Sequence, residues 1–164
     1  MNRSRLSIPV ILLVASAPLA VAQVPMAQPV EAKAHFYTPT DLTWGAGPAS
    51  LPAGVQAAVL EGNPTEAGPF TMRLKLPAGY RIAPHWHPAA EHVTVVSGVL
   101  YIGQGEKADT TAMRELPPGT FMLMPPRTPH YARTRGETII QLHGIGPWGI
   151  TYVNPADDPR PKPN

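Results

Sequence analysis

Four side chains that can bind a metal ion stand out by their types and spacing. His85, His87 and Glu91 fall within seven residues, and His130 follows later, behind a proline-rich turn. Imidazole nitrogens and a carboxylate oxygen together suit a divalent transition metal, and two histidines with one carboxylate form a known open site for iron. The sequence therefore points first to metal chemistry.

The His-x-His pair predicts an extended strand rather than a helix. Residues i and i+2 of a strand share one face, whereas in a helix they diverge. Pro84 and Pro88 bracket the pair and also argue against a helix. Glu91 then opens an apolar run typical of a strand, and strand alternation turns the adjacent His92 to the opposite face. We interpret His92 as a structural or subunit-surface residue.

The stretch around these residues resembles the first motif of the cupin family. In this sequence the motif is Gly79, five residues, His85-x-His87, three residues, Glu91, six residues and Gly98, which fills every position of the family pattern. The second cupin motif is matched in part. Its glycine, proline and histidine positions hold Gly119, Pro125 and His130, whereas Arg127 replaces a glycine and Thr134 an asparagine. The two departures affect the shape of the loop rather than the ligand position.

The resemblance, which spans roughly residues 70 to 145, implies a fold and a site. Cupins are double-sheet jelly rolls, so we expect one all-β domain of that type, an antiparallel β-barrel. The resemblance implies that His85, His87, Glu91 and His130 together bind one metal ion. It also implies that Glu91 can leave the metal and act as a general base, as in some cupin dioxygenases. Cupins commonly pair through a sheet face or edge, which implies a homodimer.

Residues 1–22 have the composition of a secretory signal peptide. Arg3 and Arg5 make a basic start, residues 8–19 are mostly apolar, and an Ala-x-Ala cleavage site ends at Ala22. The apolar stretch is too short and too interrupted for a stable membrane span. We therefore expect cleavage after Ala22 and a periplasmic or secreted protein without a membrane span. The whole chain resembles the small exported cupin-domain proteins of bacteria.

Charge and cysteine content exclude several classes of protein. The chain has 13 basic and 11 acidic residues, and loss of Arg3 and Arg5 with the signal peptide brings the formal charge near zero. The sequence has no basic stripe that would attract phosphate groups, so nucleic acid is not expected as a partner. The expected partner is a small molecule. The absence of cysteine excludes disulfides, thiolate catalysis and cysteine-based zinc sites.

The pattern along the chain predicts one domain with short flanking segments. A flexible spacer at 23–34 precedes a cupin domain at 35–153, and a proline-rich tail at 154–164 is expected to be disordered. Within the domain, short apolar runs between Gly/Pro turns, and no strong helix, predict an antiparallel sandwich or barrel. Strands are expected at 70–76, where apolar and polar residues alternate, and at 148–153, with a turn at 114–119.

Two candidates for orienting a ligand or binding substrate lie on the strand after His130. Gln141 and His143 share one face of that strand. If this face is inward, both belong to the site. If Ile140 and Leu142 face inward instead, Gln141 and His143 are surface residues, and the period of so short a run leaves both alternatives open.

Two further candidates lie elsewhere. Tyr101 is either a proton or hydrogen-bond donor to the site or a core residue. Arg127 either draws in a carboxylate or enolate substrate or is a solvated loop residue.

Two classes of function fit these observations. The first is a metal-dependent small-molecule enzyme, with a dioxygenase-type oxidoreductase favoured over an isomerase or lyase. The second is a non-catalytic protein that holds a metal or metabolite in the cell envelope. One divalent ion of Fe, Mn, Cu, Ni or Zn suits the donor set, and export of the unfolded chain would favour Cu or Zn by intrinsic affinity.

Overall fold

The structure is a computed structural model that describes residues 33–162. The chain forms two compact units, Met1–His35 and Phe36–Asn164. The predicted signal peptide and nearly all of the predicted spacer lie outside the described residues. The fold and the site belong to the second unit.

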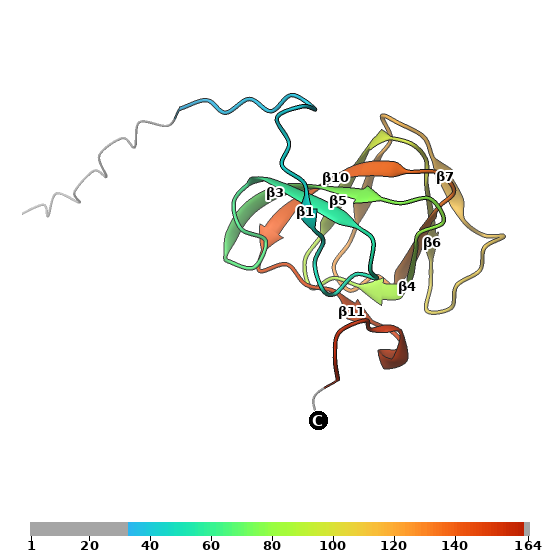
Figure 1. Cartoon of the computed structure of the whole chain (residues 1–164). Helices are drawn as coiled ribbons and strands as arrows, with labels where there is room; N and C mark the ends of the chain where they lie inside the picture. The colour runs from blue at the N-terminus through green and yellow to red at the C-terminus, as the bar shows by residue number, and fades with distance from the viewer. Residues whose placement is uncertain (1–32, 163–164) are drawn as a thin grey trace, which may run out of the picture. The chain divides into compact units, whose positions relative to one another are not determined.

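The regular secondary structure in the described part of the second unit is almost entirely β-strand. The strands are β1 (Gly45–Ala46), β2 (Gln56–Glu61), β3 (Gly68–Leu76), β4 (Arg81–Trp86), β5 (Glu91–Ser97), β6 (Leu100–Gln104), β7 (Arg114–Leu116), β8 (Phe121–Met124), β9 (His130–Thr134), β10 (Thr138–Gly146) and β11 (Thr151–Tyr152). A six-stranded sheet has the order β1-β2-β3-β10-β5-β8, and a five-stranded sheet has the order β11-β4-β9-β6-β7 (Figure 1). Among the described residues, no helix is long and apolar enough to cross a membrane.

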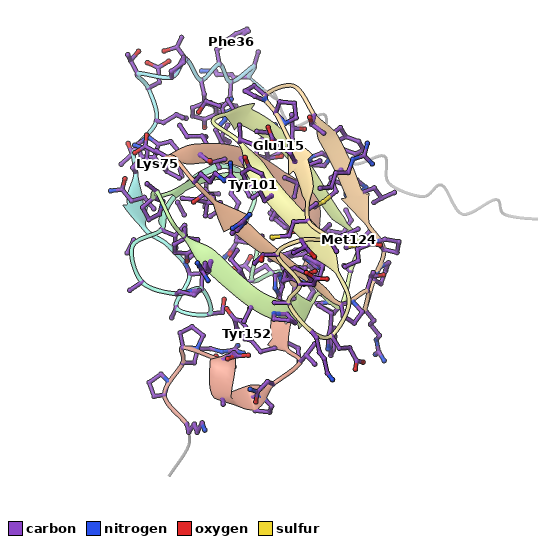
Figure 2. All side chains as sticks on the ribbon, turned by 90° about the vertical axis from the view of Figure 1, so that its right-hand side faces the viewer. Phe36, Lys75, Tyr101, Glu115, Met124 and Tyr152 are labelled. Atoms are coloured by element: carbon purple, nitrogen blue, oxygen red, sulfur yellow. The ribbon has the colours of Figure 1, made fainter. Side chains whose placement is uncertain are left out.

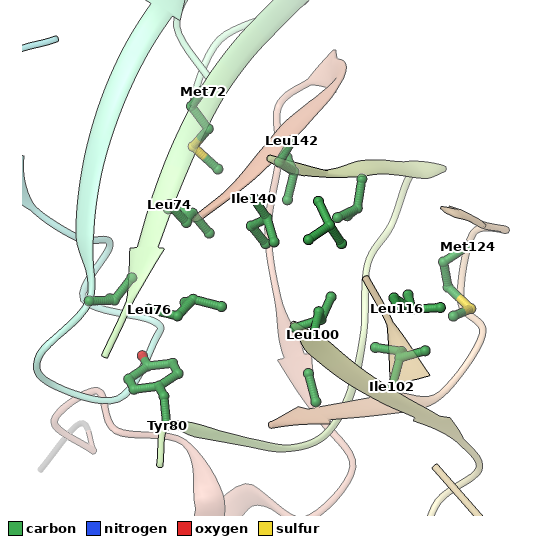
Figure 3. Packing of buried hydrophobic residues seen from close by; sticks show 14 of the residues in the cluster. Met72, Leu74, Leu76, Tyr80, Leu100, Ile102, Leu116, Met124, Ile140 and Leu142 are labelled. Carbon is green, nitrogen blue, oxygen red and sulfur yellow. The ribbon is translucent and has the colours of Figure 1, made fainter. Parts of the chain in front are cut away.

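The two sheets share one hydrophobic core. Leu74 and Ile140 of the six-stranded sheet belong to the same cluster as Leu100 and Ile102 of the five-stranded sheet (Figure 3). No ladder between described strands joins the two sheets into a closed barrel. The predicted all-β jelly roll is therefore confirmed, in the form of a two-sheet sandwich.

Strand β3 shows how the sequence directs this packing. Its apolar residues Phe70, Met72, Leu74 and Leu76 are buried, and the residues between them are only partly buried. This is the alternation expected of a strand with one face on the core. Burial of each such side chain contributes about 1.5–3 kcal/mol, as an upper estimate. The inner face of β3 also forms part of the cavity described below.

Two segments differ from the sequence prediction. Residues 114–119, expected to form a turn, begin with β7, which pairs Leu116 with Leu100 and Glu115 with Tyr101 (Figure 2). Residues 148–153, expected to form the last strand, contain only the two residues of β11. Whether so short a segment forms a strand depends on pairing with a neighbouring strand, and local β-propensity says little about that pairing.

Residues 154–162, where a disordered tail is expected, are instead held to the domain. Asn154 caps a short 3-10 helix, Pro155–Asp157, through its side chain. Arg160 pairs with Asp158 and donates a hydrogen bond of 3.2 Å to the carbonyl of Ile150. These local polar contacts order a segment whose composition lacks any apolar period.

Candidate metal centre

The four predicted metal ligands come from three strands and one loop. His85 lies near the end of β4, and His130 is the first residue of β9. The two strands are neighbours, and their register places His85 opposite His130. His87 directly follows β4, and Glu91 opens β5 in the other sheet. The site therefore lies where the two sheets face each other.

The donor atoms of these residues converge. One ring nitrogen from each of His85, His87 and His130 lies within 4.8 Å of the other two. Glu91 reaches two of the rings, with Oε2 at 3.2 Å from Nε2 of His130 and Oε1 at 3.5 Å from Nε2 of His87. All four side chains are buried, with exposed fractions of 7% or less. The structure thus brings together the three candidate ligands of the first motif and His130 of the second.

Each imidazole is oriented by a main-chain carbonyl. The three Nδ1 atoms lie 2.7–2.9 Å from carbonyl oxygens, those of Ala83 for His85, Gly149 for His87 and Thr128 for His130. A carbonyl only accepts, so each Nδ1 carries the proton, and in a neutral ring Nε2 is then left with a lone pair. This is the arrangement in which the far nitrogen of a histidine binds a metal.

The donor set fits a divalent transition metal. Nε2 of His87 is buried and has no hydrogen-bond partner, and an unsatisfied buried polar atom of this kind calls for an explanation. With neutral rings and an ionised Glu91, lone pairs of His130 and Glu91 also face each other at 3.2 Å. One proton shared between two of these atoms would satisfy only that pair of lone pairs. A cation bound by all four side chains would satisfy the three Nε2 atoms and the carboxylate together. Three imidazoles and one carboxylate are suitable ligands for such an ion.

Burial sets the protonation of the site. It lowers the pKa of His85 to about 3, with repulsion from His130 and His87 acting in the same direction. Burial also lowers the pKa of His87. For Glu91 burial raises the pKa, but the neighbouring histidines favour the carboxylate more strongly, so the pKa of Glu91 is lowered. Neutral imidazoles and an ionised carboxylate are the forms that bind metal.

A cavity of about 190 Å³ adjoins the donors. His85, His87 and Glu91 form part of its wall, and apolar side chains from β3 and β10 form much of the rest. The indole of Trp148 also lines it and stacks on His87, with ring centroids 4.3 Å apart and planes at 20°. Trp148 is not among the site residues predicted from the sequence, because its position against His87 follows from the tertiary fold and not from any local motif.

Gln141 and His143 lie outside the site. Ile140 and Leu142 of β10 line the cavity, so the two polar residues between and after them point to the outer face of the sheet. There Gln141 accepts a hydrogen bond of 3.1 Å from Nε of Arg73. His143 stacks on His92, with ring centroids 4.8 Å apart. The inward alternative for Gln141 and His143 is therefore wrong.

Tyr101 is also remote from the cavity. Its ring lies under the guanidinium groups of Arg133 and Arg135, whose central carbons are 5.2 Å and 5.0 Å from its centroid. Its strand neighbours Leu100 and Ile102 belong to the core cluster, so alternation turns Tyr101 to the other face of the sheet, where it is still buried, with an exposed fraction of 8%.

Arg127 shapes a loop and does not line the cavity. It adopts a left-handed backbone conformation with φ 57°, which explains why cupins prefer glycine at this position. Its amide donates a hydrogen bond of 2.8 Å to the carbonyl of His87. Its guanidinium lies over the ring of Trp86, 5.7 Å from the centroid. Arg127 is exposed and does not line the cavity, which favours the solvated loop residue over a residue that draws in an anionic substrate.

Thr134, which stands where the family pattern has asparagine, links two segments of the chain through its hydroxyl. Its hydroxyl donates a hydrogen bond of 2.6 Å to the carbonyl of Pro77 and accepts one of 3.1 Å from the amide of Tyr80. The turn that leads into β4 is thereby tied to β9, the strand that carries His130.

A two-sheet jelly roll with histidines from both motifs at its centre defines the class of cupins. Residues 32–148 match the family model described as the ChrR cupin-like domain. Because this match covers more than half of the chain, the protein belongs to the cupin family. No curated protein matches the chain significantly.

Solved structures share the fold at low sequence identity. A protein of Methylibium petroleiphilum PM1 considered to be an acetylacetone dioxygenase is 18% identical, with a TM-score of 0.61, over 82% of this chain and 91% of that one. The polyketide cyclase RemF of Streptomyces resistomycificus is 15% identical, with a TM-score of 0.61, over 77% and 90%. KdgF of Halomonas sp. is 20% identical, with a TM-score of 0.52, over 70% and 96%. At these identities the likeness shows the fold alone.

Proposed function

We propose that the protein is an exported, metal-dependent enzyme that acts on a small molecule as a dioxygenase-type oxidoreductase. One observation carries this proposal: the cavity borders three of the four donor residues, His85, His87 and Glu91. Structural metal sites are closed by protein ligands, whereas catalytic sites keep a side open to substrate. His85, His87, His130 and Glu91 are the residues that would hold the ion.

The side chains of the site have separate roles in this proposal. A redox-active ion held there would supply Lewis-acid and electron-transfer chemistry at the end of the cavity. Burial keeps His85 and His87 neutral, and the carbonyls that accept the Nδ1 protons of all three histidines leave each Nε2 as the donor atom. Glu91, ionised and in the cavity wall, accepts a proton from the substrate. The apolar walls exclude water from the reacting groups.

The Glu91→Gln variant tests this role. The amide that replaces the carboxylate keeps the size of the side chain but cannot take a proton, so oxygen uptake should fall by at least about 100-fold. Oxygen consumption is measured with the metal-reconstituted protein. The test compounds are acetylacetone, after which the similar protein of Methylibium petroleiphilum PM1 is named, and a panel of other short carbonyl compounds. A matched Glu115→Gln variant on the outer strand β7 should keep full activity.

Two results would count against the enzyme. Equal turnover by Glu91→Gln and the wild type would remove Glu91 as the base. Binding of these compounds by the metal-loaded wild type without any turnover would favour the non-catalytic binding protein.

Export rests on the basic and apolar pattern of residues 1–22. Protein isolated from the periplasm or medium of its natural host should begin at Gln23, as measured by intact mass and N-terminal sequencing. Copper or zinc should be its main metal, because a chain exported unfolded meets its metal outside the cytoplasm. Of the two only copper is redox-active, so protein loaded mainly with zinc would favour Lewis-acid chemistry over the oxidoreductase. Full-length protein retained inside the cell would contradict export, and mainly Fe or Mn in the exported protein would contradict the metal expectation.

The proposed homodimer uses the outer face of the six-stranded sheet near β8. The exposed side chains there include Phe121, Leu123 and Ile145, with exposed fractions of 56%, 52% and 61%. The outward positions of β5, β8 and β10 hold no Asp, Glu, Lys or Arg among them. Proteins usually protect an edge strand such as β8 with charged residues. An uncharged face of this kind, with exposed apolar side chains along it, suits a second copy of the same chain.

The double variant Phe121→Asp, Leu123→Asp should convert the dimer into a monomer. Each aspartate would bury a charge without a partner in the contact. Light scattering coupled to size-exclusion chromatography measures the mass, and circular dichroism checks the fold. Phe36→Asp, at a residue that is 85% exposed, is the control and should remain dimeric. A wild type that is monomeric at all concentrations would rule out this interface.

A further inference from the structure

The cavity at the metal centre is small. Its volume of about 190 Å³ equals that of about six molecules of liquid water. Sites for drug-sized ligands are larger, commonly beyond 300 Å³. The ligand that fits here is therefore a compact molecule.

The walls of the cavity are apolar on the sheet side. Met72 and Leu74 of β3 and Ile140 and Leu142 of β10 line it, together with Ile82 of β4. All four residues from β3 and β10 are at most 5% exposed. None of these side chains can donate a hydrogen bond, and the thioether sulfur of Met72 is only a weak acceptor.

Charge is confined to one part of this lining. Among the described residues that line the cavity, Glu91 is the only one with a charged side chain, and none is Lys or Arg. Strand alternation turns the basic residues Arg73 and Lys75 of β3 to the outer face. Besides Glu91 and the histidines, the lining side chains with polar atoms are Ser50, Thr65 and Trp148, and all three come from loops and not from the sheets.

This distribution constrains the ligand. A charged or strongly polar group against the β3 and β10 walls would lose its hydration and find no partner, which is unfavourable. Away from the loops that carry Ser50 and Thr65, oxygen atoms of the ligand are accommodated only at the end formed by His85, His87 and Glu91. We propose, as an extension that rests on the proposed function, that the substrate is a compact molecule with oxygen donors at one end and an uncharged, apolar remainder. Sugars, amino acids and dicarboxylates do not meet this description.

Binding of three probes to the zinc-loaded protein tests the proposal. Valerate, succinate and laurate each offer a carboxylate to the metal end and differ in the rest of the molecule. Valerate should bind at least about tenfold more tightly than succinate, because the second carboxylate of succinate would be buried without a partner. Laurate exceeds the cavity and should bind no more tightly than succinate. Isothermal titration calorimetry gives the three affinities.

Variants of the wall locate the binding. Leu142→Phe places extra volume in the cavity, and Leu51→Trp does so from a partly buried loop residue, in case the first variant packs poorly. Either should weaken valerate binding at least about tenfold with the zinc content unchanged. The control Leu123→Phe lies on the outer face and should bind valerate like the wild type.

The outcomes separate this inference from the function on which it rests. Succinate binding as tightly as valerate, absence of valerate binding, or valerate binding unaffected in both folded wall variants would overturn the substrate class while the zinc content still supports the metal centre. A wild type that holds no zinc after reconstitution would overturn the metal centre and the substrate class together.

Discussion

Replacement of His130 by alanine is expected to lower the bound metal from about one equivalent to less than about a tenth of that amount. Loss of a hydrogen-bond partner behind a metal ligand already weakens metal binding about 10–100-fold, and loss of a ligand itself removes more. His130 is 1% exposed, so no solvent-exposed group can take its place. Elemental analysis of the reconstituted and desalted protein measures the effect.

His143→Ala is the matched control for this experiment. His143 lies on the outer face of β10, stacked on His92, and should retain the full metal content when replaced. Equal metal in His130→Ala and the wild type would exclude His130 as a ligand. Absence of metal from both, even after reconstitution, would mean that the buried histidines are structural.

Replacement of Phe70 by alanine should lower the free energy of unfolding by about 3–5 kcal/mol. Phe70 is 1% exposed and is among the largest fully buried side chains of the described residues. Its ring lies 5.7 Å from that of Trp148, which in turn stacks on His87. The variant therefore leaves a void in the core next to the cavity wall. Urea unfolding of the metal-free protein measures the change without a contribution from bound metal.

Phe36→Ala removes the same atoms from a residue that is 85% exposed and should change the free energy by less than about 0.5 kcal/mol. A loss below about 1 kcal/mol for Phe70→Ala would show that the core around Phe70 collapses to fill the void. The metal affinity of Phe70→Ala is also informative, because a decrease would show that Trp148 helps to fix His87.

The fold and the side chains of the candidate metal centre could be predicted from the sequence because both depend on local spacing. The alternation of β3 and the His-x-His pair report directly on strand geometry, in which every second residue shares a face. The spacing of Glu91 and the two flanking glycines added a long pattern that chance rarely produces. His130 could be placed only through the second motif, because its pairing with His85 joins strands distant in the sequence.

The parts that could not be predicted depend on tertiary contacts. The run Ile139 to His143 fits either face of a strand equally well, and only packing of Ile140 and Leu142 against the core decides it. Arg127 shows that a family position can keep its backbone conformation after the glycine is lost. The cavity and the place of Trp148 arise from loops whose path the sequence does not encode locally.

The main-chain anchors of the three histidines have a consequence for how this protein can change over evolutionary time. The acceptors are carbonyl oxygens of Ala83, Thr128 and Gly149, and a substitution at those positions leaves the carbonyl in the chain. Mutations that reshape the cavity can therefore accumulate without removing the groups that orient the rings. Substitutions in the cavity walls can change the substrate while the residues of the candidate metal centre stay the same. Descendants of this protein can therefore inherit the same centre and act on different substrates.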